Sequence, residues 1–451
     1  DQDQNGFLEV QQKLVSFQGE SLEHGAHGLR LGPDGMLYVI IGNGSQLSGT
    51  PDSKSPYQFF YEGDLIPRFE DPGGHALGVA APGGTIIRVS LDGTRKEVVA
   101  GGIRNAYDLV FDAWGDLFFH DSDMESDMGS NWYRPTMVFH VPDGAEFGWR
   151  SGWSKFPQYY VDQMPALCET GRGSPTGAVL YQHTQFPESH QNAMFFADWS
   201  EGRILMLQAK ATGAGYMGQA ETFLRGRPLN VVDLSVGLDG SLYFCTGGRG
   251  TKGGVYRVFS TSDQPEPLAE ASAIAKAIDQ PQPMAAWARQ RVAQLKIELG
   301  DQWGPEIESV AIDKTQTLKN RIRAMQLMVF FGPVPSDELL IQLSEDEDER
   351  IRGQVARLCG LKKGRDIEVL LGNLLADTSP AVRRKAGESW MRMDAFPPLP
   401  PVYAMLGSLD RAEALVARRI LEKIPAEQWE NEIINSDELR LFIQGLVALM
   451  A

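Results

Sequence analysis

The chain divides into two parts that differ in how apolar and polar residues alternate. Up to about residue 260, short apolar runs lie between Gly, Pro and Asp turns, which is typical of β-strands. Beyond about residue 284, apolar residues recur at i, i+3 and i+4, which is typical of amphipathic helices. A Pro-containing segment between these parts indicates a linker that encloses one helical piece. We therefore expect a β domain (1–260), a linker (261–283) and a helical domain (284–451).

One hairpin motif recurs in the first part. Residues 31–39 and 236–244 share a Gly-x-Asp-Gly turn followed by an alternating apolar run, and residues 111–119 are a more divergent copy. Each copy predicts a tight turn, with glycine at positive φ, that leads into a strand. A sandwich is the alternative, but one of about 100 residues could not absorb this span. We expect a β-propeller: about five blades can be counted, and about six would complete it, with an N-terminal part that is incomplete.

A second repeat marks the helical part. An acidic turn followed by an arginine on an apolar helix occurs at residues 346–352 and 377–383, more weakly at 410–416, and an earlier copy lies at 320–328. We expect Asp to cap each helix and the apolar positions to face the neighbouring repeat. The pattern predicts an α-solenoid of HEAT-like repeats. Because residues 447–451 stay in helical register without a polar cap, we expect that more protein followed.

Composition narrows the possible functions. The chain has 451 residues, too many for one core, and a formal charge of -17, which disfavours nucleic acid and anionic membranes as partners. Its three cysteines lack any C-x-x-C spacing, so we expect free buried thiols. There is no run of 18 apolar residues and no visible signal peptide, and the first residue is Asp1, so we expect a processed or truncated chain. Two long loops, 43–75 and 121–136, are candidates for function.

Three segments resemble a known enzyme family. His24 stands eight residues before the Gly-Pro-Asp-Gly turn, followed by Gly-Ile-Arg-Asn at 102–105 and by residues 144–149. In this order they resemble the soluble quinoprotein glucose/sorbosone dehydrogenases. The chain is more similar still to planctomycete-type membrane-bound dehydrogenases, which fuse such a propeller to HEAT-like repeats and often to a cytochrome c segment. The sequence segments that resemble this group are residues 104–108, 121–125, 132–136, 146–152, 173–177 and 247–250.

The resemblance implies an oxidoreductase that depends on pyrroloquinoline quinone (PQQ) and oxidises a sugar or alcohol. It also implies export to the periplasm or cell envelope and a cytochrome as electron acceptor. Hydride transfer to a quinone needs a base for the hydroxyl proton, and His24 is the matching candidate. His27 would face the other side of a strand, so we expect at most one of the two histidines in a pocket. A solvated or structural role is the alternative for His24.

Cofactor and metal ligands are implied by two further motifs. Arg104 and Asn105 match the positions that contact the cofactor, and a guanidinium suits an anionic tricarboxylate. Asp121, Asp123 and Glu125, with Asp127, offer oxygen ligands at alternating positions, and the resemblance implies an activating Ca²⁺ there. A structural arginine and a solvated acidic loop are the alternatives.

Three positions depart from the family pattern. Ser200 stands where the related enzymes carry a lysine, and Asn230 and Val232 stand where they carry arginines. With three cationic groups missing, PQQ would be held much less tightly. No C-x-x-C-H motif occurs, so this chain lacks the haem site that often accompanies the group.

The departures leave a second function open, a non-catalytic propeller and solenoid that binds a glycan, or a protein partner on the helical repeats. Aromatic residues between 132 and 160 could stack on sugar rings or pack the core. They are Trp132, Tyr133, Trp149, Trp153, Tyr159 and Tyr160.

Overall fold

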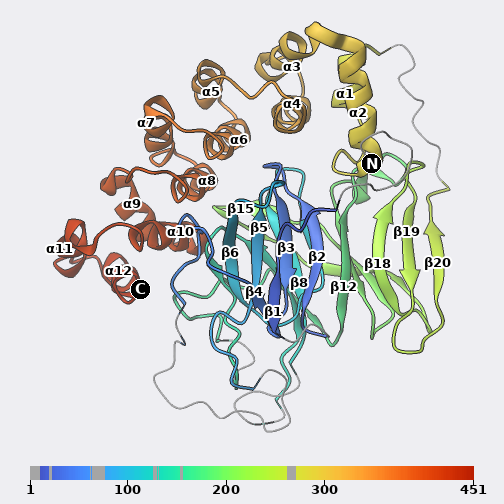
Figure 1. The fold of residues 1–451 in the computed structure, drawn as a ribbon, viewed down its shortest axis with the longest axis horizontal. Coiled ribbons are helices and arrows are strands. Elements are labelled where there is room, and N and C mark those ends of the chain that lie inside the picture. The colour runs from blue at the N-terminus through green and yellow to red at the C-terminus, as the bar shows by residue number, and fades with distance from the viewer. Residues whose placement is uncertain are drawn as a thin grey trace.

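The structure is a computed structural model that describes residues 11–19, 23–60, 62, 77–124, 130, 132–152, 156–261 and 271–451. Within these residues the strands end at Val258 and the α-helices begin at Ala273. Figure 1 shows the helices as an arc that runs along one side of the sheets. Of the described helices, none is both long and apolar enough to cross a membrane. Cys168, Cys245 and Cys359 are free thiols, and Cys245 is only half-buried.

Among the described residues, four sheets of three or more strands make up the β half, and apart from β10 the strands of each sheet pair antiparallel in chain order. The first contains β2 (Ala26–Leu31), β3 (Leu37–Ile41), β5 (Gly84–Val89) and β6 (Lys96–Ile103), with β10 (Ala145–Glu146) parallel to β6. The second contains β7 (Leu109–Phe111), β8 (Leu117–Asp121), β9 (Thr136–Val141) and β11 (Cys168–Gly171). The third contains β12 (Pro175–Leu180), β13 (Met194–Asp198), β14 (Arg203–Leu207) and β17 (Ala220–Arg225), and the fourth β18 (Val231–Val236), β19 (Leu242–Thr246) and β20 (Gly254–Val258).

Two short ribbons accompany these sheets. β1 (Phe17–Gly19) pairs with β4 (Ser45–Leu47), and β15 (Lys210–Thr212) pairs with β16 (Gly215–Met217).

The three predicted hairpins are confirmed. In each copy the first strand of a sheet pairs with the second, across a turn whose glycine has positive φ: Gly35 (+76°), Gly115 (+83°) and Gly240 (+75°). Asp34 and Asp239 stabilise their turns by accepting a hydrogen bond from the backbone N–H two residues on. The turns are therefore encoded locally, by an Asp that bonds its own backbone and a glycine that tolerates the left-handed region.

The first strands of the four sheets contact one another in chain order, β2 with β7, β7 with β12, and β12 with β18. Buried Asp108 joins three of the sheets, because it pairs with Arg30 of β2, precedes β7 and accepts from the backbone N–H of Ala178 in β12 at 2.8 Å. This radial arrangement is of the propeller kind and differs from two facing sheets. The described residues form four such sheets and no closed ring, so the expectation of about six blades is not met within them.

The helical half consists of successive antiparallel pairs. After α1 (Ala273–Ile278) and α2 (Ala286–Leu299) come α3 (Trp303–Ile312) with α4 (Leu318–Phe331), α5 (Asp337–Ser344) with α6 (Glu349–Cys359), and α7 (Arg365–Leu374) with α8 (Pro380–Trp390). The last pairs are α9 (Leu399–Leu406) with α10 (Arg411–Leu421), and α11 (Glu430–Ile434) with α12 (Leu439–Leu449). The second helices α4, α6, α8, α10 and α12 pack on one another in that order. The HEAT-like classification stays a prediction.

A ladder of ion pairs links these repeats. Arg321, Arg352 and Arg383 each occupy the fourth position of α4, α6 and α8. Arg321 pairs with Asp346 at 2.6 Å, Arg352 pairs with Asp377 at 2.7 Å, and Arg383 pairs with Glu413. The copy that was predicted at residues 320–328 is therefore a true member of the series, since Arg321 makes the same kind of contact.

The predicted caps need one correction. Asp410 caps α10, because its carboxylate accepts from the backbone N–H groups of Ala412 and Glu413. Asp348, within the 346–352 motif, caps α6 in the same way by accepting from the backbone N–H of Arg350. Asp346 and Asp377 lie two residues before the cap positions, and their carboxylates accept from the backbone N–H of Asp348 and Ser379 instead. The acidic turn thus holds the N-cap residue and, at the same time, binds the arginine of the preceding repeat.

Arg352→Ala is expected to lower the free energy of unfolding by about 2 kcal/mol, because the largely buried Asp377 loses a two-pronged, charge-assisted bond. Arg350→Ala is the matched control, since that guanidinium is half exposed and pairs within its own turn; its effect should stay below about 1 kcal/mol. Urea denaturation followed by circular dichroism measures both. Equal effects of the two variants would contradict the ladder as a stabilising contact.

The arc packs against the turn ends of the sheets. Gln326 of α4 and Gln354 of α6 donate to the carbonyl oxygens of Ala113 and Trp114, at 2.9 and 2.6 Å. Further along, Ala412 and Leu415 of α10 belong to one apolar core with residues of the first two sheets. The inner side of the arc therefore already has an occupant, the β half of the same chain.

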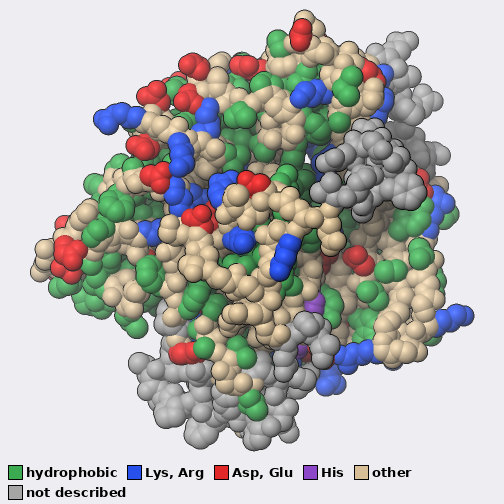
Figure 2. Space-filling view, viewed as in Figure 1, with side chains coloured by type: hydrophobic (Ala, Val, Ile, Leu, Met, Phe, Trp, Pro, Cys, Tyr) green, Lys and Arg blue, Asp and Glu red, His purple; other side chains and the backbone are tan. Residues whose placement is uncertain are grey.

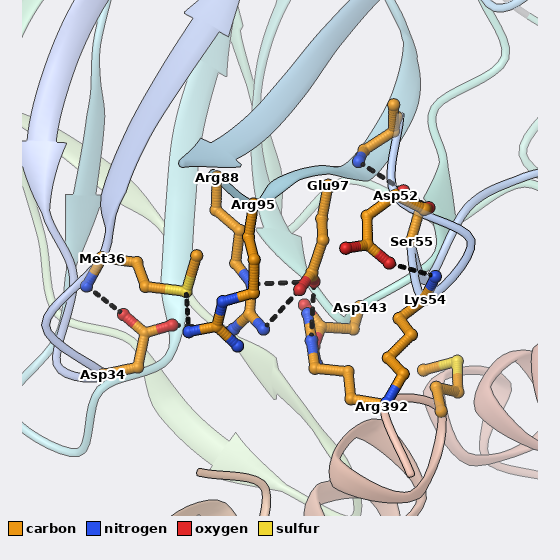
Figure 3. A network of polar contacts seen from close by, with 12 residues as sticks. Asp34, Met36, Asp52, Lys54, Ser55, Arg88, Arg95, Glu97, Asp143 and Arg392 are labelled. Atoms are coloured by element: carbon orange, nitrogen blue, oxygen red, sulfur yellow. Dashed lines mark hydrogen bonds and ion pairs between the residues drawn. The ribbon is translucent and has the colours of Figure 1, made fainter. Parts of the chain in front are cut away.

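Buried ion pairs reinforce this junction, and Figure 3 shows one group of them. Arg392, just after α8, pairs with Glu97 of β6 at 2.9 Å and with Asp143. Arg88 of β5 binds the same Glu97 at 2.8 Å and reaches Asp34 at 2.7 Å. Burial opposes ionisation of Glu97, but attraction by Arg392 and Arg88 outweighs it and lowers the pKa of Glu97 to about 2. The carboxylate is thus charged throughout the physiological pH range.

Candidate functional site

A cavity of about 450 Å³ lies at the ends of the sheets opposite the Asp-Gly turns. Its walls come from the segments just before each first strand and just after the second strands. All four sheets contribute, and among the lining residues are His24, Arg104, Asn105, Asp123, Trp199 and Arg249. Since the helical arc covers the other ends of the strands, this face is left for a ligand.

His24 lines this cavity and is held by a buried amide. Its Nδ1 lies 2.5 Å from Oδ1 of Asn43, a residue that is 2% exposed. An amide oxygen can only accept, so Nδ1 donates this hydrogen bond, and in the neutral imidazole Nε2 is then the nitrogen with a lone pair. The backbone N–H of Asn43 also donates to the carbonyl oxygen of Arg104 at 2.8 Å. Asn43 therefore fixes the histidine tautomer and ties His24 to the Arg104 segment.

Of the two histidines, His24 lines the cavity and His27 does not. The Nε2 of His27 lies 2.9 Å from Oδ1 of Asn105, and its ring stacks on Tyr107 with centroids 3.9 Å apart. Burial lowers the pKa of His27. This histidine is a structural neighbour of the site.

Arg104 and Asn105 both line the cavity, and both are mostly buried. Nη1 of Arg104 donates to the hydroxyl of Ser122 at 3.0 Å. The amide of Asn105 is used at both ends, by His27 and by the carbonyl oxygen of Glu23. Asn105 therefore holds two loops together, which is a structural role. The predicted cofactor contact of both residues stays a prediction.

Asp121 holds together two of the segments that line the cavity. Its side chain is 0% exposed and accepts from three backbone N–H groups, those of Arg104 at 3.1 Å, Asn105 at 2.9 Å and Ser122 at 2.9 Å. Asp121 does not line the cavity, whereas Asp123 does. The carboxylate thus places the Arg104 and Ser122 segments side by side.

The calcium prediction is not supported by the described residues. Glu125 and Asp127 lie outside them, and within them no three His, Cys, Asp or Glu side chains are placed to hold a metal ion together. Asp123 accepts from the hydroxyl of Tyr133 at 2.8 Å. A Ca²⁺ site at Asp121, Asp123 and Glu125 stays a prediction, and Asp121 has a structural role that does not require the ion.

One kind of hydrogen bond recurs in three sheets and explains why the residues that line the cavity lie close together. A polar side chain at or just after the end of the second strand bonds the segment before the first strand of the same sheet. Asn43 does so with His24, Asp121 with Arg104 and Asn105, and Asp198 with the N–H of Ser174 at 2.8 Å. Sequence reasoning missed Asn43 and Asp198 for different reasons. Asn43 bonds the side chain of a residue 19 positions away, and Asp198 bonds a backbone N–H group, which leaves no residue-type pattern.

Charge in the cavity is balanced among the described residues. Arg104 and Arg249 are the lining cations, and Glu23 and Asp123 are the lining carboxylates. Arg249 pairs with Glu23 across the mouth, a contact between the fourth sheet and the segment before the first. Arg249 belongs to the Gly-Gly-Arg-Gly segment at residues 247–250, to which the sequence analysis assigned no role.

The three residues that depart from the family pattern lie at different places relative to the cavity. Val232 lines the cavity, so an arginine there would have faced a ligand. Asn230 donates to the carbonyl oxygen of Trp199 at 2.9 Å, and Ser200 is exposed and does not line the cavity. The described lining therefore has an apolar side chain at a position where a cofactor-binding cation was expected.

The aromatic residues divide between the two predicted roles. Trp149 is 1% exposed and packs on Gly83, as core packing predicts. Trp132 and Tyr133 are exposed, and Tyr133 bonds Asp123 at the cavity. Trp153 lies outside the described residues. The cavity wall also contains Trp199, whose indole donates to the carbonyl oxygen of Gly247 at 2.6 Å.

No protein-family model and no curated protein matches the chain. Among solved structures it is similar to a glucose dehydrogenase-type oxidoreductase of Thermus thermophilus, with 21% identity, a TM-score of 0.35, and coverage of 51% of this chain and 65% of that one. It is also similar to the PQQ-bound aldose sugar dehydrogenase of Streptomyces coelicolor, with 17% identity, a TM-score of 0.32, and coverage of 52% and 61%.

A third similar structure is the apo form of the soluble aldose sugar dehydrogenase of Escherichia coli, with 15% identity, a TM-score of 0.30, and coverage of 48% of this chain and 73% of that one. The matches span less than two thirds of the Thermus and Streptomyces chains. The structural neighbours are thus glucose and aldose sugar dehydrogenases, at identities and TM-scores too low to assign a function. The resemblance to planctomycete-type membrane-bound dehydrogenases stays a prediction.

Proposed function

We propose that the cavity at the strand ends binds a sugar or a related polyol. The observation that carries this proposal is the convergence of an imidazole, two guanidinium groups, two carboxylates and several hydroxyls, from all four sheets, on one cavity of about 450 Å³. Such a set offers both donors and acceptors, which the hydroxyl groups of a sugar require.

Two further features favour a neutral polyol over an anion. Two cations face two carboxylates in the described lining, so the cavity has no net charge to attract an anionic ligand. Trp199 and Tyr107 add aromatic surface, on which the C–H faces of a sugar ring can stack. Val232 adds a further apolar contact on the side of the fourth sheet.

A dehydrogenase acting on that sugar is the second candidate, and the His24–Asn43 contact favours it. With its proton on Nδ1, His24 presents Nε2 as an acceptor for the proton of a substrate hydroxyl. The hydride that leaves the same carbon then needs an oxidant, and PQQ is the one that the resemblance implies. The described lining does not fit that tricarboxylate, because its cations are matched by carboxylates and Val232 replaces a cation.

Isothermal titration of the full chain with aldoses and alditols tests the sugar site. We expect binding in the absence of any quinone, and at least a tenfold loss of affinity in Arg104→Ala, whose guanidinium lines the cavity. Arg225→Ala is the control. Arg225 ends the outer strand β17, and its exposed side chain pairs with Glu201, so this substitution should leave the affinity for sugar unchanged. Binding that Arg104→Ala leaves intact, or no binding across the panel, would refute the proposal.

Dye reduction separates the two candidates. The titration is repeated with PQQ and Ca²⁺, and substrate-dependent reduction of a dye is recorded for the unmodified chain and for His24→Ala. Reduction that His24→Ala abolishes, while sugar binding persists, would establish the dehydrogenase. Sugar binding without any reduction would leave the binding function alone.

A further inference from the structure

The cavity at the strand ends has a polar side and an apolar side. Among the described lining residues, the imidazole and every charged group except Arg249 belong to the first two sheets or to the segment that leads into them. Pro175, Trp199 and Val232, by contrast, belong to the third and fourth sheets. In Figure 2, histidine side chains in purple mark the polar side, next to the place of β2 in Figure 1. A ligand in this cavity therefore meets mainly hydrogen-bonding groups on one side and apolar surface on the other.

Trp199 is the largest of these apolar side chains, and it is anchored by one edge of its ring. Its indole Nε1 donates to the carbonyl oxygen of Gly247 at 2.6 Å. A hydrogen bond from Nε1 lies in the plane of the indole, so this bond uses an edge of the ring and neither of its two faces. A Cβ on Gly248 would lie 3.4 Å from the same nitrogen, and Gly248 has a φ of +87°. The loop can therefore approach the indole edge closely because a glycine stands there.

The backbone of Trp199 is held by two further segments. Its N–H donates to the carbonyl oxygen of Ser174 at 2.8 Å, and its carbonyl oxygen accepts from the side-chain amide of Asn230 at 2.9 Å. Ser174 precedes β12 and Asn230 precedes β18, so the third and fourth sheets both fix this residue. The indole is therefore in place before a ligand arrives, and contact with a preorganised side chain costs little conformational entropy on binding.

A closed sugar ring fits this two-sided lining better than an open-chain polyol does. A pyranose carries C–H groups on its ring faces and hydroxyl groups around its rim, so one face can stack on an indole while the rim reaches the polar side. An alditol carries a hydroxyl group on every carbon of a flexible chain and has no flat C–H face. It also loses more conformational entropy on binding, because the torsions of its chain become fixed.

We propose that a pyranose ring stacks on Trp199, and that this contact makes the cavity selective for closed-ring sugars over alditols. The inference rests on the proposed sugar site and names the class of sugar that the site takes. In this arrangement the hydroxyl groups of the ring face His24 and Arg104, and Val232 adds apolar contact on the side of the indole. Trp199 then determines specificity, because only the ring form can make the stacking contact.

Isothermal titration of the full chain with matched pairs of ligands tests the inference. The ligands are the methyl β-pyranosides of glucose, galactose and mannose, whose rings cannot open, each paired with the alditol of the same configuration. For the best-binding pair we expect the pyranoside to bind at least about tenfold more tightly than its alditol. Trp199→Ala should weaken binding of the pyranoside at least about tenfold and that of the alditol less than about threefold, so the selectivity is lost.

Trp287→Ala is the matched control. The Trp287 indole is also half-buried and also donates to a backbone carbonyl oxygen, that of Val236 at 3.3 Å, but at the opposite end of the fourth sheet. This substitution should leave the affinities for both classes of ligand unchanged. Trp199→Phe keeps an aromatic face without the indole N–H, and its selectivity should fall between those of Trp199→Ala and the unmodified chain.

Two results would overturn the inference and leave the proposed sugar site standing. One is equal affinity of the unmodified chain for a pyranoside and its alditol, and the other is a Trp199→Ala variant that weakens binding of both classes equally. Absence of binding by either class would overturn the inference and the proposed site together. If Trp199→Ala does not fold, Trp199→Phe decides, because full selectivity in a variant that lacks the anchored indole would contradict the role of Trp199.

Discussion

Asp116→Ala is expected to lower the free energy of unfolding by about 3–5 kcal/mol, which would be the largest effect of any single substitution considered for this chain. The Asp116 carboxylate is 3% exposed and lies where the helical arc meets the second sheet. It pairs with Arg384 at 2.9 Å and Lys385 at 3.0 Å, both from α8, and accepts from the Tyr216 hydroxyl at 2.6 Å. Removing it would leave buried cations without their partner.

The same substitution has a predictable pH dependence. Burial opposes ionisation of Asp116, but attraction by Lys385 and Arg384 outweighs it and holds the pKa of this carboxyl well below its ordinary value. A carboxyl with a depressed folded-state pKa stabilises the protein above its unfolded pKa of about 3.9, and this contribution is lost as the pH falls through the folded-state value. The difference between Asp116→Ala and the unmodified chain should therefore be full at pH 7 and shrink below about pH 4.

Urea denaturation at pH 7 and pH 3 measures both the loss of unfolding free energy and its dependence on pH. Asp394→Asn is the control, because Asp394 also joins the two halves, through Lys54, but at the exposed surface. Its unfolding midpoint should match that of the unmodified chain. An equally small change in the unfolding midpoint of Asp116→Ala would contradict a stabilising role of the buried Asp116 contacts.

Asp121→Ala is expected to cost about 3 kcal/mol of stability and to abolish ligand binding in the cavity. Three backbone N–H groups, at Arg104, Asn105 and Ser122, would lose their common acceptor, and each unsatisfied group costs about 1–3 kcal/mol before water enters. Asp121→Asn retains one accepting oxygen, so its effect should fall between those of Asp121→Ala and the unmodified chain. Thermal unfolding and calorimetric titration measure the two consequences.

EDTA distinguishes this structural role from calcium ligation. If Asp121 acts through the backbone, its loss should cost the same stability with and without the chelator. Asp123→Asn is the control, since Asp123 lines the cavity and should alter binding more than stability. A penalty for Asp121→Ala that disappears in EDTA would show that Asp121 works mainly through a metal ion.

The sequence predicted those features that short segments determine. The hairpins at Gly35, Gly115 and Gly240 were predictable because turn chemistry and strand alternation act within about nine residues. The Arg ladder was visible as a repeat for the same reason. The number of sheets was not, because the long loops interrupt the period and give no count of the strands that they join.

Contacts between distant residues were beyond sequence reasoning. Asp116 and Arg384 are separated by 268 residues, and nothing local marks either as one half of a buried pair. Likewise, Glu23 and Arg249 are 226 positions apart in the sequence, yet their contact closes one side of the cavity. Asp121 was identified as functional from its place in an acidic loop, but its actual partners are backbone N–H groups, which every residue carries.

The predicted site residues converge because of the shared architecture of the sheets. His24, Arg104 and Asn105 line one cavity, Asp123 joins them, and Val232 stands at the wall where a cation was expected. We therefore propose that this face binds a neutral polyol, while the helical arc packs against the opposite ends of the strands.

A crystal structure of the full chain soaked with the tightest-binding aldose, without quinone, tests that claim most directly. The prediction is a sugar in the strand-end cavity, with a hydroxyl within hydrogen-bonding distance of Nε2 of His24 and another at the Arg104 guanidinium. Sugar density at a different surface, or an empty cavity at a concentration that saturates binding in solution, would contradict it.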